Sequence, residues 1–363
     1  MTAIDQDVAG ITPAYRWLVA ISGLSGTISV ILSATMINVA VPSIMGAFGV
    51  GQDIAQWTAT AFIATMVTGQ LMNSWMVNAF GERYAYCLTL ILFTVSSLVC
   101  AVTPNIEILI AGRIVQGFTA GVIQPLVLAT IISVFPENRR GFAIGLFGMG
   151  ITMAPSFGPF IGGLTIDALT WRHIFIAPLP LVGLSFLMGL LFMPTRKLAT
   201  RLPSFDWTGF ILLCVSLVCL MSAIGNGQRW GWGSDGILIM FLIGFMAAAA
   251  FVYSQLHIRN PLLDPTLFLN PRFTAAMMIA FVFGAGNFAT NYAIPVFTQT
   301  IQNYTPTRAG SVLIPAGIVL VMLIPFSGRL ADRVKHHYMI MIGLVLFAFS
   351  NYVMADADVN TPF

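Results

Sequence analysis

Residues 109–134 read LIAGRIVQGFTAGVIQPLVLATIISV, an unbroken apolar run that carries a single charged residue, Arg113. A run of about 20 apolar residues is long enough to cross a lipid bilayer as a helix. An arginine inside such a helix costs about 2.5–3.5 kcal/mol even on the gentler insertion scales, so it is expected to face a protein interior or a water-filled cavity. Arg113 is therefore either a structural residue satisfied by backbone carbonyls of neighbouring helices or a charge beside a transport pathway, and we favour the pathway.

The composition places the chain among membrane proteins. Of its 363 residues, 58% are hydrophobic and only 8% are charged, whereas soluble domains carry about 25% charged residues. The apolar runs are continuous and show no ten-residue alternation, so the spanning elements are predicted to be helices rather than barrel strands. The net charge is only +3 and the basic residues are dispersed, which argues against a nucleic-acid partner. The predicted fold class is an all-α polytopic membrane protein.

Eleven membrane-spanning helices are predicted. Each is an apolar run about as long as a bilayer requires. The predicted spans are 17–41, 55–77, 84–103, 106–134, 141–166, 173–193, 207–225, 236–256, 273–299, 309–331 and 338–354. The first span is too long for the core of a signal peptide and lacks a small-residue cleavage site, so it is expected to remain as a span.

The basic residues divide unevenly between the two faces of the membrane if the N-terminus is cytoplasmic. Twelve of the 16 then lie on the cytoplasmic face: Arg16, Arg83, Arg139, Arg140, Arg196, Lys197, Arg201, Arg259, Arg272, Arg329, Arg333 and Lys335. The opposite face receives Arg172, Arg229 and Arg308. An excess of Lys and Arg in cytoplasmic loops is what the positive-inside rule requires. We therefore predict a cytoplasmic N-terminus in a plasma membrane, the inner membrane of a bacterium.

No constellation typical of an enzyme is found in the sequence. The four cysteines, Cys87, Cys100, Cys214 and Cys219, lie in apolar runs without metal-ligand spacing and are interpreted as small core residues. A phosphate-binding G-x-x-x-x-G-K-[ST] loop is absent, which argues against ATP-driven transport within this chain. An acid/base pair and a Ser/His/Asp set are absent too. We predict a protein that is not an enzyme and holds no metal or other cofactor.

Two features of the sequence recur at a nearly constant offset. Asn38 and Pro42, near the end of the first span, correspond to Asn291 and Pro295 in the ninth, 253 residues later. The loop 74–83 recurs at 328–333, at an offset of 254. These repeats predict two homologous halves. The predicted domains are an N-terminal six-helix bundle (1–200), two extra central helices (201–260) and a C-terminal bundle (261–363), which has only three spans and is expected to lack about three helices.

The short loop after the tenth span has the features of a conformational latch. Gly328 lets two helix ends approach, Asp332 can pair with an arginine and accept from the start of the next helix, and Arg333 holds the loop at the cytoplasmic surface. The alternative is an ordinary basic loop. The equivalent loop of the first half contributes Asn78, Gly81 and Arg83, with an amide where the carboxylate would be.

Small residues and prolines recur along the fifth span. Small residues four apart let membrane helices pack backbone to backbone, and prolines kink a helix where its neighbours can absorb the freed carbonyls. The residues that carry the pattern are Pro155, Gly158, Pro159, Gly162 and Gly163. The span is either a hinge-like helix against the other half or a helix that packs tightly without moving.

Several motifs occur together along the chain. They are Arg113-x-x-Gln116-Gly117, Pro155 with 158–163, the turn 171–175, the segment 205–209, the linker 260–264, and Pro295 and Gln299 followed by 309–315 and the loop at Gly328. In combination they resemble the major facilitator superfamily, in particular its fourteen-helix drug:proton antiporter branch of multidrug efflux permeases. The resemblance covers nearly the whole chain.

This resemblance implies alternating access, in which two helical bundles rock about a cavity near the membrane midplane. It further implies export of lipophilic, often cationic drugs in exchange for protons. The implied partners are the lipid bilayer, a small-molecule substrate and, in a Gram-negative bacterium, a periplasmic adaptor. The first-helix signature of the antiporters has an acidic residue associated with proton coupling and cation binding, where this chain has Ser33. An arginine without that acid favours anionic or neutral solutes.

Polar side chains within the spans that match the family's pore-lining helices are the candidate pathway residues. A buried amide costs free energy unless it is hydrogen-bonded, so each is expected to face a neighbouring helix or a water-lined path. They are Asn38, Gln70, Arg113, Gln116, Gln124, Asn287, Asn291 and Gln299. Trp57 and Tyr292 could line the same cavity, although packing or interface anchoring is the simpler interpretation.

The predicted function is secondary active transport of small organic solutes or drugs, in the direction of efflux. Two alternatives stay open: a transport-incompetent relic or interaction subunit, and an uncoupled facilitator of anionic or neutral solutes. A reading frame that continues beyond Phe363 through about three more spans would favour a transporter, and a stop there would favour the relic.

Overall fold

The computed structural model describes residues 12–195, 204–258, 261–331, 334 and 336–355. Within these residues the chain is helical and contains no strand, which confirms the predicted all-α class, and ten segments are long and apolar enough to cross a membrane. The elements are α2 (Pro13–Phe48), α3 (Gln52–Ala55), α4 (Trp57–Val102), α5 (Ile106–Val134), η1 (Glu137–Arg139), α6 (Arg140–Ala168), η2 (Trp171–Phe175), α7 (Leu179–Phe192), α8 (Trp207–Trp230), α9 (Asp235–His257), η3 (Pro265–Leu269), α10 (Pro271–Thr300), α11 (Pro306–Ser311), α12 (Ile314–Ala331) and α13 (His336–Ala355).

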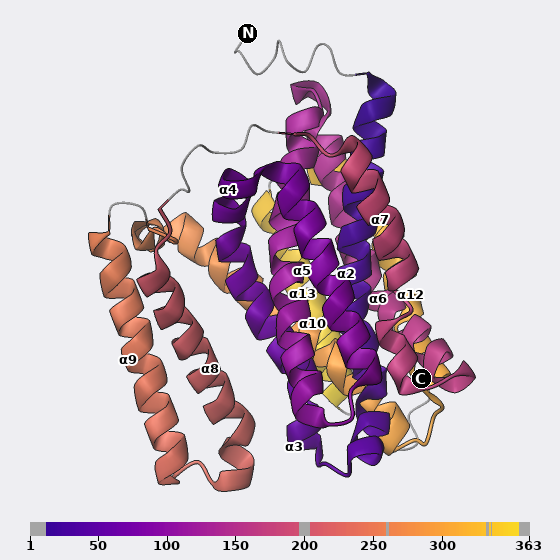
Figure 1. The fold of residues 1–363 in the computed structure, drawn as a ribbon, viewed down its shortest axis with the longest axis vertical. Helices are drawn as coiled ribbons and strands as arrows, with labels where there is room; N and C mark the ends of the chain where they lie inside the picture. Colours follow the sequence, from indigo (N-terminus) through magenta and orange to yellow (C-terminus); the bar gives the residue numbers. More distant parts are fainter. Residues whose placement is uncertain (1–11, 196–203, 259–260, 332–333, 335, 356–363) are drawn as a thin grey trace.

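Helix α2 defines the two ends of the molecule. The Thr12 side chain accepts a hydrogen bond from the backbone N–H of Tyr15 and so caps the first turn. The helix ends at Gly49, whose φ of 64° is a left-handed conformation that glycine adopts without strain. In Figure 1, α2 descends from the end of the picture marked N to the end at which α3 lies. We call the end at Pro13 the upper end and the end at Phe48 the lower end.

Helix α4 crosses the molecule twice. The apolar segment Gln52–Val102 has 51 residues, and a straight helix of that length would measure about 75 Å, more than twice the roughly 30 Å of a bilayer core. Gly81 breaks the segment with φ 77° and ψ 163°, which lie outside the helical region. Figure 1 shows the ribbon turning back at the upper end, near the label α4. The predicted spans 55–77 and 84–103 therefore correspond to two arms of this one element.

The first arm of α4 packs on α5 through glycines. A Cβ added at Gly117 would collide with the backbone oxygen of Phe62, and one added at Gly121 would collide with that of Met66. The two contacts follow the same order along both helices, so this arm is parallel to α5. Glycine permits this approach because it has no side chain, as in other small-residue contacts between membrane helices.

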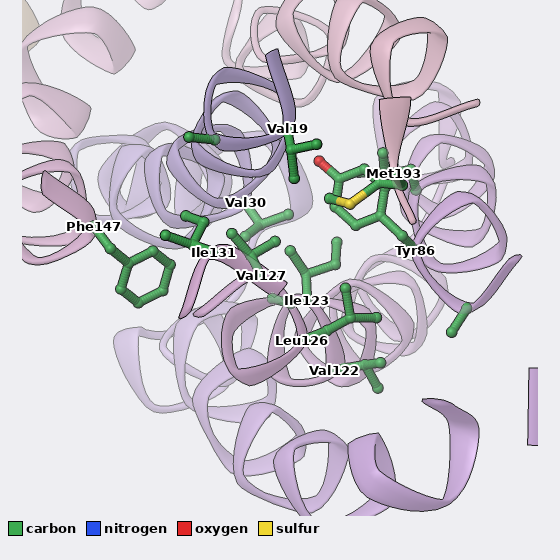
Figure 2. Close-up of a cluster of buried hydrophobic side chains, with 14 of the residues drawn as sticks. Val19, Val30, Tyr86, Val122, Ile123, Leu126, Val127, Ile131, Phe147 and Met193 are labelled. Atoms are coloured by element: carbon green, nitrogen blue, oxygen red, sulfur yellow. The ribbon is translucent and has the colours of Figure 1, made fainter. Parts of the chain in front are cut away.

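The core of the N-terminal part lies where α2, α4, α5, α6 and α7 meet. Figure 2 shows the side chains of Val30, Ile123 and Val127 gathered at this point, and all three are fully buried. The Tyr86 hydroxyl of α4 donates to the backbone oxygen of Ser22 in α2 at 2.7 Å. Lipid tails are as apolar as these side chains, so close packing and interhelical hydrogen bonds, rather than exclusion from water, hold the helices together.

Helices α8 and α9 form a hairpin that stands beside the other helices (Figure 1). The carboxylate of Asp206, which caps α8, accepts a hydrogen bond from the Gln255 side chain of α9 at 2.6 Å. Phe205 and Trp207, where α8 begins, lie with their ring centroids 5.7 and 6.2 Å from that of Trp75 in α4. This aromatic cluster attaches the hairpin to α4 at the upper end.

The C-terminal helices meet α6 at the lower end of the molecule. A Cβ added at Gly310 of α11 would collide with the backbone of Pro159, and one added at Gly163 of α6 would collide with the backbone of Pro306. The two helices are therefore in backbone contact over this stretch.

A hydrogen bond reinforces this contact at the lower end of α6. The carboxylate of Asp167 accepts from the backbone N–H of Thr307 at 2.9 Å. The upper part of α6 differs, because a Cβ added there would meet no atom within 4 Å at Gly141, Gly145 or Gly148. Among the described residues, α6 and α11 thus approach one another where α6 ends and not where it begins.

Candidate functional site

Arg113 is fully buried among the N-terminal helices, with 0% of its surface exposed. Its Nε donates to the backbone oxygen of Thr58 at 2.7 Å, and its Nη1 donates to the backbone oxygen and to the Oγ of Ser33, both at 3.3 Å. Nη1 also donates to Gln116 Oε1 at 2.9 Å, and Gln116 Nε2 donates to Ser97 Oγ at 2.6 Å. These five residues, the Arg113 cluster, join α5 to α2 and to both arms of α4.

The guanidinium is held by oxygens and an aromatic ring. Its Cζ lies 4.2 Å from the ring centroid of Phe62, a cation–π geometry worth about 0.5–2 kcal/mol. In the described part of the chain, none of its hydrogen-bond acceptors is a carboxylate, and Nη2 has no hydrogen-bond partner. A buried N–H without a partner costs about 1–3 kcal/mol. Glu107, the acidic residue of α5, is exposed near the lower end.

A cavity of about 240 Å³ lies on the other side of the α2 and α4 segments that hold Arg113. We call it the junction cavity; its lining includes Ala34, Thr35 and Asn38 of α2, Ala59 and Thr60 of α4, and Phe288 and Tyr292 of α10. Ser33 immediately precedes Ala34 and Thr58 immediately precedes Ala59, so the partners of Arg113 are sequence neighbours of lining residues on both helices. Arg113 is not among the lining residues. The charge therefore lies one layer behind the cavity wall.

Asn38 and Asn291, the residues at equivalent places of the sequence repeat, contact each other. The Nδ2 of Asn38 donates to the backbone oxygen of Asn291 at 3.2 Å. The Nδ2 of Asn291 donates to the backbone oxygen and the Oδ1 of Asn287 at 3.0 and 2.6 Å. These three asparagines, the asparagine contact, join α2 to α10 beside the junction cavity.

A second cavity, of about 380 Å³, lies on the other side of α10. Asn287 and Asn291 line it together with residues of α6, α12 and α13, and Phe288 lines both cavities. Among the residues that the structure describes, every one that lines either cavity is uncharged. The structure thus brings three of the predicted pathway residues, Asn38, Asn287 and Asn291, to two uncharged cavities separated by one helix.

Three other predicted pathway residues lie apart from these cavities. Gln70 is exposed on α4. Gln124 donates to the sulfur of Met66 at 3.6 Å. Gln299 donates to the backbone oxygen of Pro295 in its own helix at 3.1 Å. None of the three lines either cavity described above.

The small residues of α6 face two neighbours. Gly158 and Gly162 approach α2, where an added Cβ would meet the Thr35 side chain and the backbone of Met36. On the side of α11, Pro159 and Gly163 make the backbone contacts described above, while Pro155 lines the second cavity. These contacts agree with the packing interpretation of the span, and bending of α6 stays a prediction.

The first-half latch loop is organised around helix ends. Gly81 makes the turn within α4, and Asn78 is exposed. The Arg83 Nε donates at 2.8 Å to the backbone oxygen of Met193, the residue that caps the C-terminus of α7, where a cation is stabilising. In the second half, Gly328 lies in the last turns of α12, while Asp332 and Arg333 lie outside the described residues.

Four polar residues of the junction cavity are not among the predicted pathway residues. Thr35, Gln56 and Thr60 line the junction cavity, but small polar residues in spans most often bond to their own helix and so give no distinct signal. Tyr292 was interpreted as a packing residue; it lines the cavity and accepts from the Gln52 side chain at 3.4 Å. Its position one residue after Asn291 was the available signal.

Comparison with protein families and curated proteins gives a consistent picture. Residues 23–357 match the model of the Major Facilitator Superfamily. The uncharacterized MFS-type transporter YhcA of Bacillus subtilis is 29% identical over 342 residues, which cover 94% of this chain and 64% of that protein. The multidrug export protein EmrB of Haemophilus influenzae is 29% identical over 327 residues, covering 89% of this chain and 63% of that protein. The chain thus spans a little under two thirds of these two relatives.

Solved structures share the fold at low sequence identity. A crystal structure of the peptide transporter POT in complex with sulfate has a TM-score of 0.65 and 12% identity, over 92% of this chain and 73% of that chain. The xylose transporter XylE from E. coli, in a partially occluded inward open conformation, has a TM-score of 0.56 and 15% identity, over 88% of this chain and 74% of that chain.

Proposed function

The chain belongs to the major facilitator superfamily, and we propose that it forms part of a secondary transporter that exports small organic solutes by alternating access. Relatives that include the multidrug export protein EmrB support efflux as the direction. Because the chain covers 64% of the first of these relatives, the proposal concerns the activity of a complete protein that contains this chain. We place it in the plasma membrane, the inner membrane of a bacterium.

The observation that carries the proposal is the contact between Asn38 and Asn291. If two halves are related by an approximate two-fold axis, equivalent residues touch each other only beside that axis. The 3.2 Å hydrogen bond between residues 253 positions apart supports such an axis between α2 and α10. In transporters built from repeats, the substrate site lies near the interface of the repeats. The two cavities beside this contact are therefore the proposed substrate site.

The contacts of α6 support an arrangement that is closed at one end. With the N-terminus in the cytoplasm, the lower end faces outward, and there α6 meets α11 through Gly163 and Gly310. The upper part of α6 makes no such contact at its glycines. Rocking would separate Gly163 from Pro306 and bring the upper parts together. We propose that this alternation exposes the junction cavity to each face in turn.

The uncharged cavity linings favour neutral solutes. The pathway role predicted for the guanidinium of Arg113 is replaced in our proposal by a framework role, because its donors are directed to α2 and α4 and it does not line the junction cavity. Ser33, in the position of the antiporter acid, supplies an acceptor to Arg113 rather than a titratable group. We therefore propose uncoupled or weakly proton-coupled transport as the second candidate function.

Proteoliposomes that contain the complete protein test both candidates. We expect transport of a neutral amphipathic dye such as Nile red to exceed transport of ethidium, a permanent cation, and of an anionic fluorescein derivative. An imposed pH gradient is expected to change the transport rate of the neutral dye little. Gradient-driven export of ethidium at a rate above that of the neutral dye would refute the proposed selectivity and coupling, and the absence of any transport would refute the transporter itself.

A further inference from the structure

A third cavity lies between the α8–α9 hairpin and the N-terminal helices. Its volume is about 850 Å³ and its walls come from α3, the start of α4 and the lower half of α8. Figure 1 shows the hairpin as a separate pair of helices beside α4. The lining residues of the cavity belong to the lower part of α8 and to the segment 52–60. We call it the hairpin cleft.

An ion pair bridges the hairpin cleft at its lower rim. Arg229 of α8 forms an ion pair with Asp53 of α3. Gly225, one turn above, lies beside α4, because a Cβ added there would be 3.8 Å from the ring of Trp57. At the upper end the hairpin is held by the aromatic cluster around Trp75. The cleft therefore lies between two attachments of the same helix.

The lining of the cleft changes from polar at the rim to apolar further in. The rim carries the ion pair together with the amides of Gln52 and Gln228, and the inner part is lined by Ile224 and Met221. Met221 lies about 12 Å above Arg229 along the helix axis, at 1.5 Å per residue. Asp53 and Arg229 neutralise each other. The Gln52 Nε2 donates to Tyr292, so the Gln228 amide and the Gln52 Oε1 are the rim groups that remain for a ligand head. This gradient fits an uncharged polar head at the rim and an apolar tail toward Met221.

The cleft adjoins the junction cavity through a shared wall. Gln56 and Thr60 line both spaces. Gln56 precedes the first helical residue of α4, so its backbone lies where the chain passes from α3 to α4. These two side chains therefore form part of the wall between the two spaces, and neither belongs to the Arg113 cluster.

From this geometry we propose that the hairpin cleft binds uncharged single-chain amphiphiles and is a lateral vestibule between the outer leaflet and the junction cavity. The proposal rests on the proposed function for the direction of movement, and on the cleft alone for binding. It assigns Gln52, Gln56 and Gln228 to the head group and Ile224 and Met221 to the tail.

Photolabelling tests binding without reference to transport. The complete protein in liposomes is irradiated with a diazirine-bearing monoacylglycerol, and the labelled peptides are mapped by mass spectrometry. We expect label on the α8 peptide around Met221 and Ile224. Gly225 lines the cleft, and a Cβ added there would make only an ordinary contact with Trp57, at 3.8 Å. The substitution Gly225→Phe therefore places a bulky side chain at the cleft wall and is expected to reduce this label about tenfold, the change produced by 1.4 kcal/mol of lost binding free energy.

A matched control makes the same change outside the cleft. Gly236 of α9 is at the same end of the hairpin but does not line the cleft, so Gly236→Phe is expected to leave the label unchanged. Equal labelling of the unaltered protein and Gly225→Phe would overturn the proposal. Stronger labelling of the same peptide by a diazirine-bearing phospholipid or fatty acid would overturn the assignment to uncharged single-chain amphiphiles.

Nile red efflux by the same variants separates the vestibule from the transporter. We expect Gly225→Phe to lower efflux about as much as it lowers labelling, while Gly236→Phe does not. Loss of labelling with unchanged efflux would overturn the vestibule role. If the unaltered protein transports no solute, the proposed function fails, and the labelling result still decides whether the cleft binds the amphiphile.

Discussion

The Arg113 cluster and the asparagine contact are polar regions on two sides of the same helical wall, and they are built differently. The cluster consists of residues from α2, α4 and α5, and all of them except Ser33 have no exposed surface. The asparagine contact joins α2 to α10 beside two cavities. A charge within a membrane protein therefore does not by itself mark a cavity. In this chain Arg113 lines neither cavity, whereas Asn38 and Asn291, at equivalent places of the repeat, each line one.

The free-energy cost of burying a guanidinium, compared with that of burying an amide, explains the difference. A buried guanidinium is tolerated only where several acceptors surround it. The carbonyls of Thr58 and Ser33 are such acceptors, and because they surround the Arg113 side chain it does not reach the junction cavity. An amide needs fewer partners and can keep one side toward a cavity. Asn38 does so, because it donates to Asn291 and also lines the junction cavity.

The largest expected effect is that of Arg113→Ala. This change leaves the acceptors on Thr58, Ser33 and Gln116 without their donor and opens a void, at a cost of roughly 2–5 kcal/mol. We expect it to abolish dye transport by the complete protein while the protein still inserts into the membrane. Transport in proteoliposomes and the amount of membrane-inserted protein are measured together.

The exposed Arg139 serves as the control for this experiment. Arg139→Ala is expected to keep transport near that of the unaltered protein. Transport by Arg113→Ala at an unaltered rate would show that the cluster is dispensable.

The next effect is expected at the lower contact between α6 and α11. Gly163→Val would overpack the contact with Pro306, at a cost of about 1–3 kcal/mol, which shifts the equilibrium away from the closed arrangement by about 5–150-fold. Gly145→Val, at a position of α6 with open space around it, is the control. Distances between spin labels on α6 and α11 report the shift. Unchanged distances in Gly163→Val would mean that this contact does not close the lower end.

A smaller effect is expected at the asparagine contact. Asn38→Ala removes the donor to Asn291 and a polar group from the junction cavity, and we expect it to weaken dye transport about fivefold, which corresponds to about 1 kcal/mol. Gln299→Ala, which removes a bond within a single helix, is expected to change transport less. Initial rates measured over a range of dye concentrations check this order. A larger effect from Gln299→Ala would contradict the comparison.

The smallest effect is expected from Ser33→Ala. The backbone oxygen of Ser33 still accepts from Arg113, so only the bond to Oγ is lost, at a cost of about 0.5–1.5 kcal/mol in the free energy of unfolding. Thermal unfolding of the purified protein is expected to shift downward, with transport little changed. The Ser29 hydroxyl donates to a backbone oxygen within α2, so Ser29→Ala is expected to lower the unfolding temperature less. A strong dependence of transport on the Ser33 hydroxyl would place that group on the solute route.

The fold was largely predictable because membrane-spanning helices are long apolar runs. The separation of spans 55–77 and 84–103 is confirmed, with Gly81 at the turn. The predicted span 309–331 divides into α11 and α12, because Pro315 in the first turn of α12 has no N–H to continue a helix. Such breaks are hard to see in a sequence where proline also occurs inside continuous helices, as Pro125 does in α5.

The site was only partly predictable, because a polar residue in a span can be satisfied in several ways. Gln124 and Gln299 have the same chemistry as Asn38 but bond to Met66 and to their own helix. Arg113 meets carbonyls where a water-filled route was expected. Which face of a helix meets a cavity depends on how neighbouring helices are rotated, and the residues of one helix do not determine that. The repeat did locate Asn38 and Asn291.

Thiol labelling at adjacent positions of α2 tests the central claim most directly. In a complete protein whose native cysteines, the four of this chain included, are replaced by alanine, Ser33→Cys would place a thiol in the Arg113 cluster and Ala34→Cys would place one in the junction cavity. We expect N-ethylmaleimide to react with Ala34→Cys, with protection by the transported dye, and not with Ser33→Cys. Rapid, dye-protected labelling of Ser33→Cys with an inert Ala34→Cys would put the solute route on the arginine side and contradict the account.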